Sequence, residues 1–137
     1  YLAAASQLPV ETPDDMLIGR PDKEMNELIA ELTQRIGARE TLPDAFYCAN
    51  DYIAIMLIRA LTTQGISIPE QVSIIGVDNN PVSALVSPQL CSLDIQCEQQ
   101  AHYALRRMTE LLQDKTSEPV RLLIQPRLIP GASVQHA

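Results

Sequence analysis

Two short apolar runs, each ending in polar residues, constrain the fold of this chain more than any other feature. The first run, residues 45–49, is followed by an Asn-Asp pair, and the second, residues 72–77, is followed by an Asp-Asn pair. Both runs are continuously apolar, which is typical of strands buried on both faces of a parallel sheet. The segment between them, residues 52–64, has helical character. The order strand, helix, strand predicts an α/β fold.

The polar residues that follow these strands predict a small-molecule site. Ligands of open α/β sheets bind in the crevice beyond the carboxyl ends of the strands. Asp78 offers a carboxylate that can accept hydrogen bonds from two vicinal hydroxyls. Asn50 offers an amide that both donates and accepts. The alternative role for each is to cap the following segment. We expect ligand contact from Asn50 and Asp78, and we expect Asp51 to be a helix N-cap.

Composition narrows the class of protein. The 137 residues carry a net charge of −7 and are 46% hydrophobic, which fits one modest domain with a packed core. The acidic balance argues against nucleic-acid binding by this chain alone. No apolar run is long enough to span a membrane. The three cysteines, Cys48, Cys91 and Cys97, predict small buried side chains in a reducing compartment, with no metal site and no cofactor.

The helix expected between the two strands is unusual because it is apolar on almost every side. From Ile53 to Leu61, only Arg59 is polar. A helix of this kind is buried on more than one side. One side is expected to cover the sheet. The other side meets either a second subunit or another part of a larger monomer, and the pattern alone does not distinguish the two.

Hydrophobic spacing predicts further elements on both sides of this unit. An amphipathic helix is expected from about residue 25 to Ile36, ending at Gly37, after a short strand at residues 16–18 and a helix start at Asp22. Later elements are a loop at 80–88, a strand at 90–95, a helix at 96–113, a strand at 120–124 with a candidate continuation at 127–129, and a loose tail at 133–137.

Three motifs in succession resemble those of a known family. Residues 43–51 read Pro-Asp-Ala-Phe-Tyr-Cys-Ala-Asn-Asp, residues 68–79 read Ile-Pro-Glu-Gln-Val-Ser-Ile-Ile-Gly-Val-Asp-Asn, and residues 87–93 read Ser-Pro-Gln-Leu-Cys-Ser-Leu. With their spacing, these motifs resemble the effector-binding domain of LacI/GalR-type bacterial transcriptional repressors. The match runs from about Leu42 to Leu112.

The resemblance implies a fold and an arrangement of lobes. It implies a three-layer, Rossmann-like lobe with a mainly parallel sheet, of the periplasmic-binding-protein-like type I. Residues 1–137 would form the C-terminal lobe of a two-lobed domain. The helix at 96–113 would belong to the other lobe in the intact protein. A helix-turn-helix headpiece and most of the N-terminal lobe would lie outside this chain.

The resemblance also implies a function. The chain would be the ligand-sensing and dimerisation part of a cytoplasmic transcriptional repressor. It would bind a sugar or related metabolite, form a homodimer and meet DNA only through the absent headpiece. By position, Asn50 and Asp78 match the family's effector contacts. The dimer contacts would fall on the helix after the Asn-Asp pair and the loop after the second strand, at Ile55, Met56, Arg59, Leu85 and Val86.

Some positions depart from the family pattern and leave the effector open. The early loop, where the family often places an aromatic residue, reads Gly19-Arg20-Pro21. Arg20 could pair with an anionic effector such as a sugar acid, or it could be a solvated surface residue. Val77 stands where the family has Phe or Tyr. The usual Gln of the crossover segment is replaced by Ile95, with Gln96 one residue on.

Two other classes compete with the repressor. A periplasmic sugar-binding protein shares the two-lobed fold, but the nearly all-apolar helix argues against a monomer. An enzyme would need a catalytic constellation. His102 lies near Glu98 on its helix, but no nucleophile is paired with it, and no Gly-rich phosphate-binding motif is present. We therefore expect no enzymatic activity.

Overall fold

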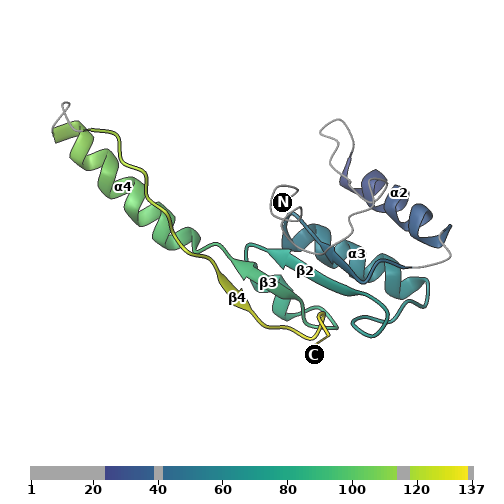
Figure 1. Cartoon of the computed structure of the whole chain (residues 1–137). Coiled ribbons are helices and arrows are strands. Elements are labelled where there is room, and N and C mark those ends of the chain that lie inside the picture. Colours follow the sequence, from purple (N-terminus) through teal and green to yellow (C-terminus); the bar gives the residue numbers. More distant parts are fainter. Residues whose placement is uncertain (1–23, 39–41, 114–117, 136–137) are drawn as a thin grey trace. The chain divides into compact units, whose positions relative to one another are not determined.

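The computed structural model describes residues 24–38, 42–113 and 118–135. The chain forms two compact units, residues 1–42 and residues 43–137. The described part of the first unit is helix α2, Met25–Gly37 (Figure 1). Ile29, Leu32 and Ile36 form its buried side, so the predicted amphipathic helix is confirmed. The predicted strand at 16–18 and the predicted helix start at Asp22 lie outside the described residues.

The second unit is built on a sheet of four strands in the order β1-β2-β3-β4. Strands β1 and β2 are parallel, β2 and β3 are parallel, and β4 closes the sheet antiparallel to β3. The predicted α/β class with a mainly parallel sheet is confirmed. The strands are β1, Ala45–Tyr47, β2, Ser73–Val77, β3, Cys91–Asp94, and β4, Arg127–Ile129.

Helix α3, Asp51–Thr63, connects β1 to β2 and packs against β2 (Figure 1). Its buried apolar residues recur at helical spacing and face the sheet. Complete burial of one such side chain stabilises the fold by about 1.5–3 kcal/mol. The sequence predicted that a second side of α3 would also be covered. In this structure the apolar residues on that side are only half-buried. The buried apolar residues of α3 are Ala54, Leu57, Ile58 and Leu61.

The C-terminal segment is hydrogen-bonded to the amino ends of β2 and β3. The Ser133 hydroxyl donates to the Ile74 carbonyl oxygen at 2.6 Å and accepts from the Cys91 amide at 2.8 Å. A Cβ at Gly131 would lie 2.4 Å from the Cys91 nitrogen, so only glycine allows this approach. The loose tail predicted from residue 133 onward is therefore wrong at Ser133, which is fully buried, because its polar atoms bond β2 and β3.

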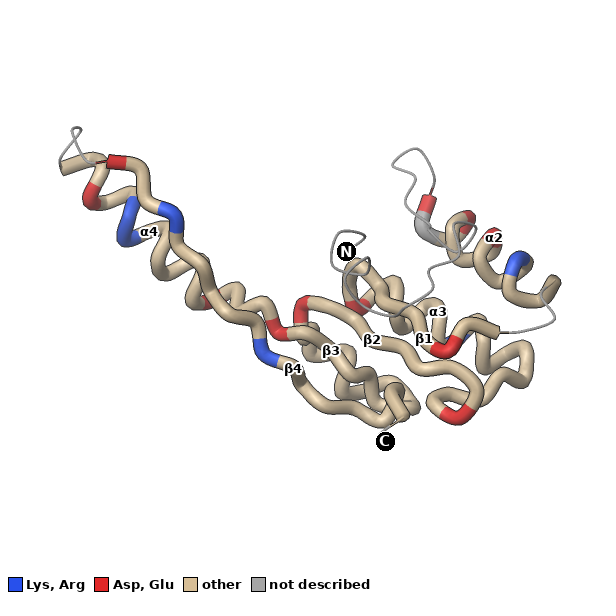
Figure 2. The backbone as a smooth tube through the Cα atoms, viewed as in Figure 1, with Lys and Arg blue, Asp and Glu red and all other residues tan. Residues whose placement is uncertain are grey.

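Helix α4, Cys97–Gln113, follows β3 and contains no buried residue. Residues 118–126 follow it without regular structure. The strand predicted at 120–124 is therefore wrong, because the described residues provide no strand to pair with it, whereas the continuation at 127–129 forms β4. In Figure 2, charges of both signs mark α4 and its neighbouring segment, while the strands are uncharged except at their ends. None of the described helices is both long and apolar enough to cross a membrane.

Candidate functional site

The carboxyl ends of β1, β2 and β3 lie at the same edge of the sheet. Tyr47 is the register partner of Ile75, and Val77 is the partner of Leu93, so the parallel strands end close to one another. The structure therefore brings the residue that directly precedes α3 and the residue that follows β2 to one edge. These are Asn50 and Asp78, the two residues selected from the sequence.

Asn50 is the N-cap of α3, and its Oδ1 accepts a hydrogen bond from the Ile53 amide at 2.9 Å. The prediction that Asp51 is the cap is wrong, because Asp51 is the first residue of the helix and its side chain is buried. Capping uses only the amide oxygen of Asn50. The amide nitrogen keeps two donors that can serve a ligand hydroxyl.

Asp51 is fully buried, and its carboxylate accepts three hydrogen bonds. Oδ2 accepts from the Asn80 amide at 2.6 Å and from the Ser83 hydroxyl at 2.7 Å. Oδ1 accepts from the Ser92 hydroxyl at 2.6 Å. The first turn of a helix also favours a negative charge. A Cβ at Gly76 would lie 2.2 Å from Oδ1, so glycine in β2 leaves the space for this carboxylate.

Asp78 is exposed and begins a turn whose backbone is held by its neighbours. Asp78 has a φ of 99° and Asn79 has a φ of 51°, a left-handed conformation that is uncommon for residues other than glycine. The Asp78 amide donates to the Leu93 carbonyl oxygen at 2.9 Å, and the Asn79 amide donates to the Ser92 hydroxyl at 3.0 Å. Strained backbone of this kind is concentrated at binding sites.

The loop after this turn contains a short 3-10 helix, η2, Pro81–Ala84, that the sequence did not predict. Asn80 caps it, since its Oδ1 accepts from the Val82 amide at 3.2 Å. Ser83 is buried at the Asp51 carboxylate. Periodicity could not reveal an element of four residues, and its bond to Asp51 joins positions 32 residues apart.

The same edge of the sheet carries a polar junction that sequence reasoning also missed. Arg127 at the start of β4 forms an ion pair with Asp94 at the end of β3, with 3.1 Å between Nη2 and Oδ2. Asp94 Oδ1 also accepts from the Gln96 amide at 2.8 Å. The Gln96 side chain donates to the carbonyl oxygen of Gln125. These contacts tie together the two chain segments that run between the sheet and α4.

The other predicted site residues differ in their exposure to solvent. Arg20 lies outside the described residues. On α3, Ile55 and Met56 are half-buried and Arg59 is exposed. In the following loop, Leu85 is 83% exposed, the highest fraction among the large exposed hydrophobic residues of the described chain, and Val86 is half-buried.

Two of the three cysteine thiols are buried in the sheet region. Burial, and then the nearby Asp51 carboxylate, raises the pKa of the Cys48 thiol to about 12. Burial also raises the pKa of Cys91, opposed by a backbone hydrogen bond from Gly131. The prediction of buried cysteines is confirmed for these two and wrong for Cys97, which is exposed on α4. Among the described residues, no group of three or more His, Cys, Asp or Glu side chains could hold a metal ion.

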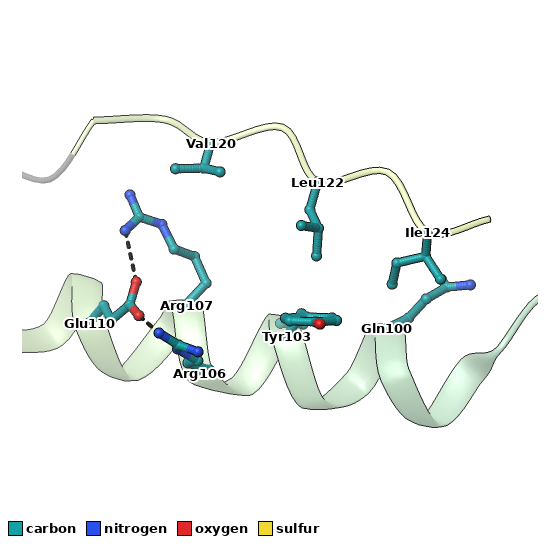
Figure 3. Close-up of a pocket in the computed structure, with 9 residues that line it drawn as sticks. Gln100, Tyr103, Arg106, Arg107, Glu110, Val120, Leu122 and Ile124 are labelled. Carbon is teal, nitrogen blue, oxygen red and sulfur yellow. Dashed lines mark hydrogen bonds and ion pairs between the residues drawn. The ribbon is translucent and has the colours of Figure 1, made fainter.

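A groove lies away from the strand ends, between α4 and residues 120–124. Figure 3 shows Val120, Leu122 and Ile124 pointing toward the helix, above side chains that include Tyr103. The groove has a volume of about 530 Å³. At one end, hydrogen bonds from Arg107 and then Arg106 lower the pKa of the Glu110 carboxyl.

His102, the histidine considered for catalysis, also lies on α4. Its ring meets the Tyr103 ring edge-on, with centroids 5.8 Å apart. The whole helix face around it is exposed. This environment gives His102 an aromatic neighbour rather than a paired nucleophile.

A family model for the periplasmic binding protein-like domain matches residues 1–134. The chain belongs to this family, in the form found in LacI-type regulators. The repressor PurR of Pasteurella multocida is 32% identical over 105 residues, which are 77% of this chain and 31% of the relative. The chain therefore spans about a third of the curated relatives that it matches. These relatives are transcriptional repressors, so the expectation of a regulator rather than an enzyme is confirmed at the level of the family.

Solved structures of regulators show the same fold. The regulator CelR in complex with cellobiose is 25% identical, with a TM-score of 0.77, and the match covers 96% of this chain and 39% of CelR. The regulator CcpA of Lactococcus lactis is 22% identical, with a TM-score of 0.79 over 98% of this chain and 48% of CcpA. The periplasmic-binding-protein-like fold expected from the sequence is confirmed.

Proposed function

We propose that this chain is the C-terminal effector-binding lobe of a cytoplasmic LacI-type repressor, and that its ligand is a sugar or a related polyhydroxylated metabolite. The observation that carries the proposal is the placement of Asn50 and Asp78 at the carboxyl edge of a parallel sheet. The relationship to regulators of this family supports it. DNA binding would belong to a domain outside this sequence.

The two side chains divide the recognition of hydroxyl groups between them. The exposed Asp78 carboxylate accepts hydrogen bonds, and those to a charged acceptor are about twice as strong as neutral ones. The Asn50 amide donates to a ligand oxygen while its own oxygen caps α3.

The exposed surfaces of α4 and residues 118–125 support a two-lobed arrangement. Leu105, Met108 and Leu112 recur at helical spacing and are 64%, 60% and 78% exposed. We infer that this helix packs in the second lobe of a longer protein, as expected for residues 96–113. In that arrangement the strand-end site is one wall of a cleft, and the second lobe supplies the other wall.

A titration of the isotopically labelled chain tests the ligand site. With one wall of the cleft missing, we expect weak binding, so the probes are cellobiose, lactose and ribose at millimolar concentrations, with adenine as a contrasting class. The amide resonances around Asn50 and Asp78 should shift with at least one sugar. Asp78→Asn should abolish the shifts, because the amide lacks the charge and one of the acceptor oxygens.

Asp44→Asn is the matched control. Asp44 is exposed and precedes β1 at the opposite edge of the sheet, so the same chemical change there should leave the shifts unaltered. Equal sugar responses in the wild type and Asp78→Asn would refute the site. Tight binding by this chain alone would refute the need for a second wall.

We also propose that the chain forms a homodimer through the half-exposed side of α3 and the loop after β2. This surface contains four apolar side chains and has Arg59 at its margin. The apolar side chains are those of Ile55, Met56, Val86 and the exposed Leu85. A two-fold interface would bring the same patch of each copy together. Burial of this patch in a second copy would explain why α3 is apolar on sides that the sheet does not cover.

Sedimentation equilibrium at high micromolar concentration tests the dimer. Leu85→Glu should give a monomer, because a charge would be buried in the interface. The substitution should leave the fold of each copy intact, because Leu85 is 83% exposed within one copy. Leu128→Glu is the control, since Leu128 is 60% exposed on β4, outside the proposed patch. A wild-type monomer, or a dimer that survives both Leu85→Glu and Ile55→Glu, would contradict this interface.

A further inference from the structure

We propose that Asp51 is the positioning residue of the ligand site, because it fixes the turn that presents Asp78. The inference rests on the proposed ligand contact of Asp78, but the geometry of Asp51 stands independently of it. Asp51 is fully buried, so it acts on a ligand only through the residues that it holds.

The carboxylate of Asp51 connects three elements that are distant in sequence. It belongs to the first turn of α3 and accepts from the amide of Asn80, 29 residues on. It also accepts from Ser83 in η2 and from Ser92 in β3. No side-chain nitrogen or oxygen atom that is buried in the described residues lacks a hydrogen-bond partner, so this polar centre is complete.

The turn at Asp78 and Asn79 depends on this centre. Both residues have positive φ, which is uncommon for residues other than glycine, although Asp and Asn adopt it more readily than most. The two amides that follow Asp78 are both held. The Asn79 amide donates to the Ser92 hydroxyl, and the Asn80 amide donates to the Asp51 carboxylate. Since the Ser92 hydroxyl accepts from Asn79, it is free to donate to Asp51, and it does so at 2.6 Å. Asp51 thus holds both amides, one of them through Ser92.

All three partners of Asp51 donate to its carboxylate: the Asn80 amide and the Ser83 hydroxyl to Oδ2, and the Ser92 hydroxyl to Oδ1. In Asp51→Asn one carboxylate oxygen becomes an NH2 group, which can only donate. An amide in this place would leave at least one of these bonds weakened or broken, although its size is the same.

Gly76 sets the position of the carboxylate. A Cβ there would approach Asp51 Oδ1 to 2.2 Å and the Asp51 Cα to 3.2 Å. Gly76→Ala would therefore keep the charge but displace the carboxylate. This variant separates the position of the group from its chemistry.

Nuclear magnetic resonance on the labelled full chain tests the positioning role. One-bond Cα–Hα couplings at Asp78 and Asn79 distinguish positive from negative φ, and amide exchange measures each hydrogen bond. In Asp51→Asn and Gly76→Ala we expect the protection of the Asn80 amide to fall about tenfold or more, and the couplings at residues 78 and 79 to move toward averaged values.

Ser133→Ala is the control for a merely structural effect. Ser133 is also fully buried and makes two side-chain hydrogen bonds, but at the amino end of the sheet. The Ser133→Ala variant should be less stable than the wild type, but its couplings at Asp78 and Asn79 should be unchanged. A turn that keeps its positive φ and its Asn80 protection in Asp51→Asn would overturn the proposal.

Ser92→Ala tests the positioning role of Asp51 if the Asp51→Asn variant does not fold. It keeps Asp51 but removes the link to Asn79, so the Asn79 amide should lose about tenfold in protection. Unchanged exchange at Asn79 would also overturn the proposal. The sugar titration of the wild type tests the ligand site separately. If the turn depends on Asp51 but the chain binds no sugar, the ligand site is refuted, while the role of Asp51 in holding the turn is not.

Discussion

The sheet with α3 and the region of α4 with residues 118–125 show opposite relations between apolar sequence and burial. In the first, Leu57, Leu61 and Ile74 are fully buried. In the second, α4 has no buried residue, although Leu105 and Leu112 follow a regular helical spacing. An amphipathic pattern therefore predicts a helix in both regions, but within the described residues only α3 has a buried apolar side.

The two regions also differ in the partners of their polar groups. Near the sheet, Asp51 and Ser133 are buried and bonded to backbone and side chains of other elements. On α4, the ion pairs of Arg106 and Arg107 with Glu110 are local, three or four residues apart. Long-range polar contacts fix one region in a single arrangement, while local pairs stabilise a helix without specifying what it packs against.

Cysteine labelling should give the largest contrast between the regions. Cys97 is exposed on α4, whereas Cys48 and Cys91 are buried beside the sheet. Native-state alkylation at pH 8, followed by peptide mass spectrometry, should modify Cys97 at least ~10³-fold faster than Cys48, because exposing a core thiol requires opening most of the fold. Comparable rates at the two sites would contradict the buried core around β1.

Leucine truncation should show the same contrast in free energy of unfolding. Leu57→Ala, in the core of α3, should cost about 2–5 kcal/mol because it leaves a cavity. Leu105→Ala should change stability by no more than about 0.5 kcal/mol, because its side chain is exposed. Urea unfolding followed by circular dichroism measures both, and a large loss in Leu105→Ala would show that α4 is covered in solution.

High pH should weaken the sheet region through Cys48. Its folded-state pKa of about 12 lies above the ordinary value of 9.0, so the unfolded chain loses the thiol proton first. The contribution of the buried thiol is complete below pH 9 and is lost as the pH rises toward 12. The free energy of unfolding should fall across this range more steeply in the wild type than in Cys48→Ala, and parallel curves would exclude this thiol as the cause.

Gly76→Ala should destabilise the sheet region by about 1–3 kcal/mol, because the added methyl group overpacks the space beside Asp51. Gly65→Ala is an instructive comparison, since nothing lies within 4 Å of a Cβ there and only its φ of 81° opposes the change. Chemical unfolding of both variants would separate crowding from backbone strain. A neutral Gly76→Ala would mean that the Asp51 carboxylate can move without loss.

Arg127→Gln should have a small effect, at the junction between the two regions. The ion pair with Asp94 is exposed on the Arg127 side, at 67% of the side chain, so its loss should cost about 0.2–1 kcal/mol. The difference from wild type should shrink in 1 M salt, where charges are screened. A larger cost that persists in high salt would give this junction a packing role as well.

Much of the sheet region could be predicted because its patterns are local. The apolar runs before Asn50 and Asp78 became β1 and β2, and the helical spacing between them became α3. Asp51 was assigned to the wrong role, since any Asp at a helix start is consistent with capping. Its three bonds come from residues 29 to 41 positions away, and no local pattern reports such distances.

The sequence by itself determined the strand-helix-strand order, the family resemblance and the two polar residues at one edge of the sheet. These depend on periodicity and on short motifs, which are properties of neighbouring residues. Only the tertiary structure decided that Asn50 caps α3, that Asp51 is buried beneath the Asp78 turn and that residues 120–124 form no strand. The cap is a contact three residues along the chain. The other two depend on which distant atoms are available to accept or donate a hydrogen bond, and that is settled only when the chain has folded.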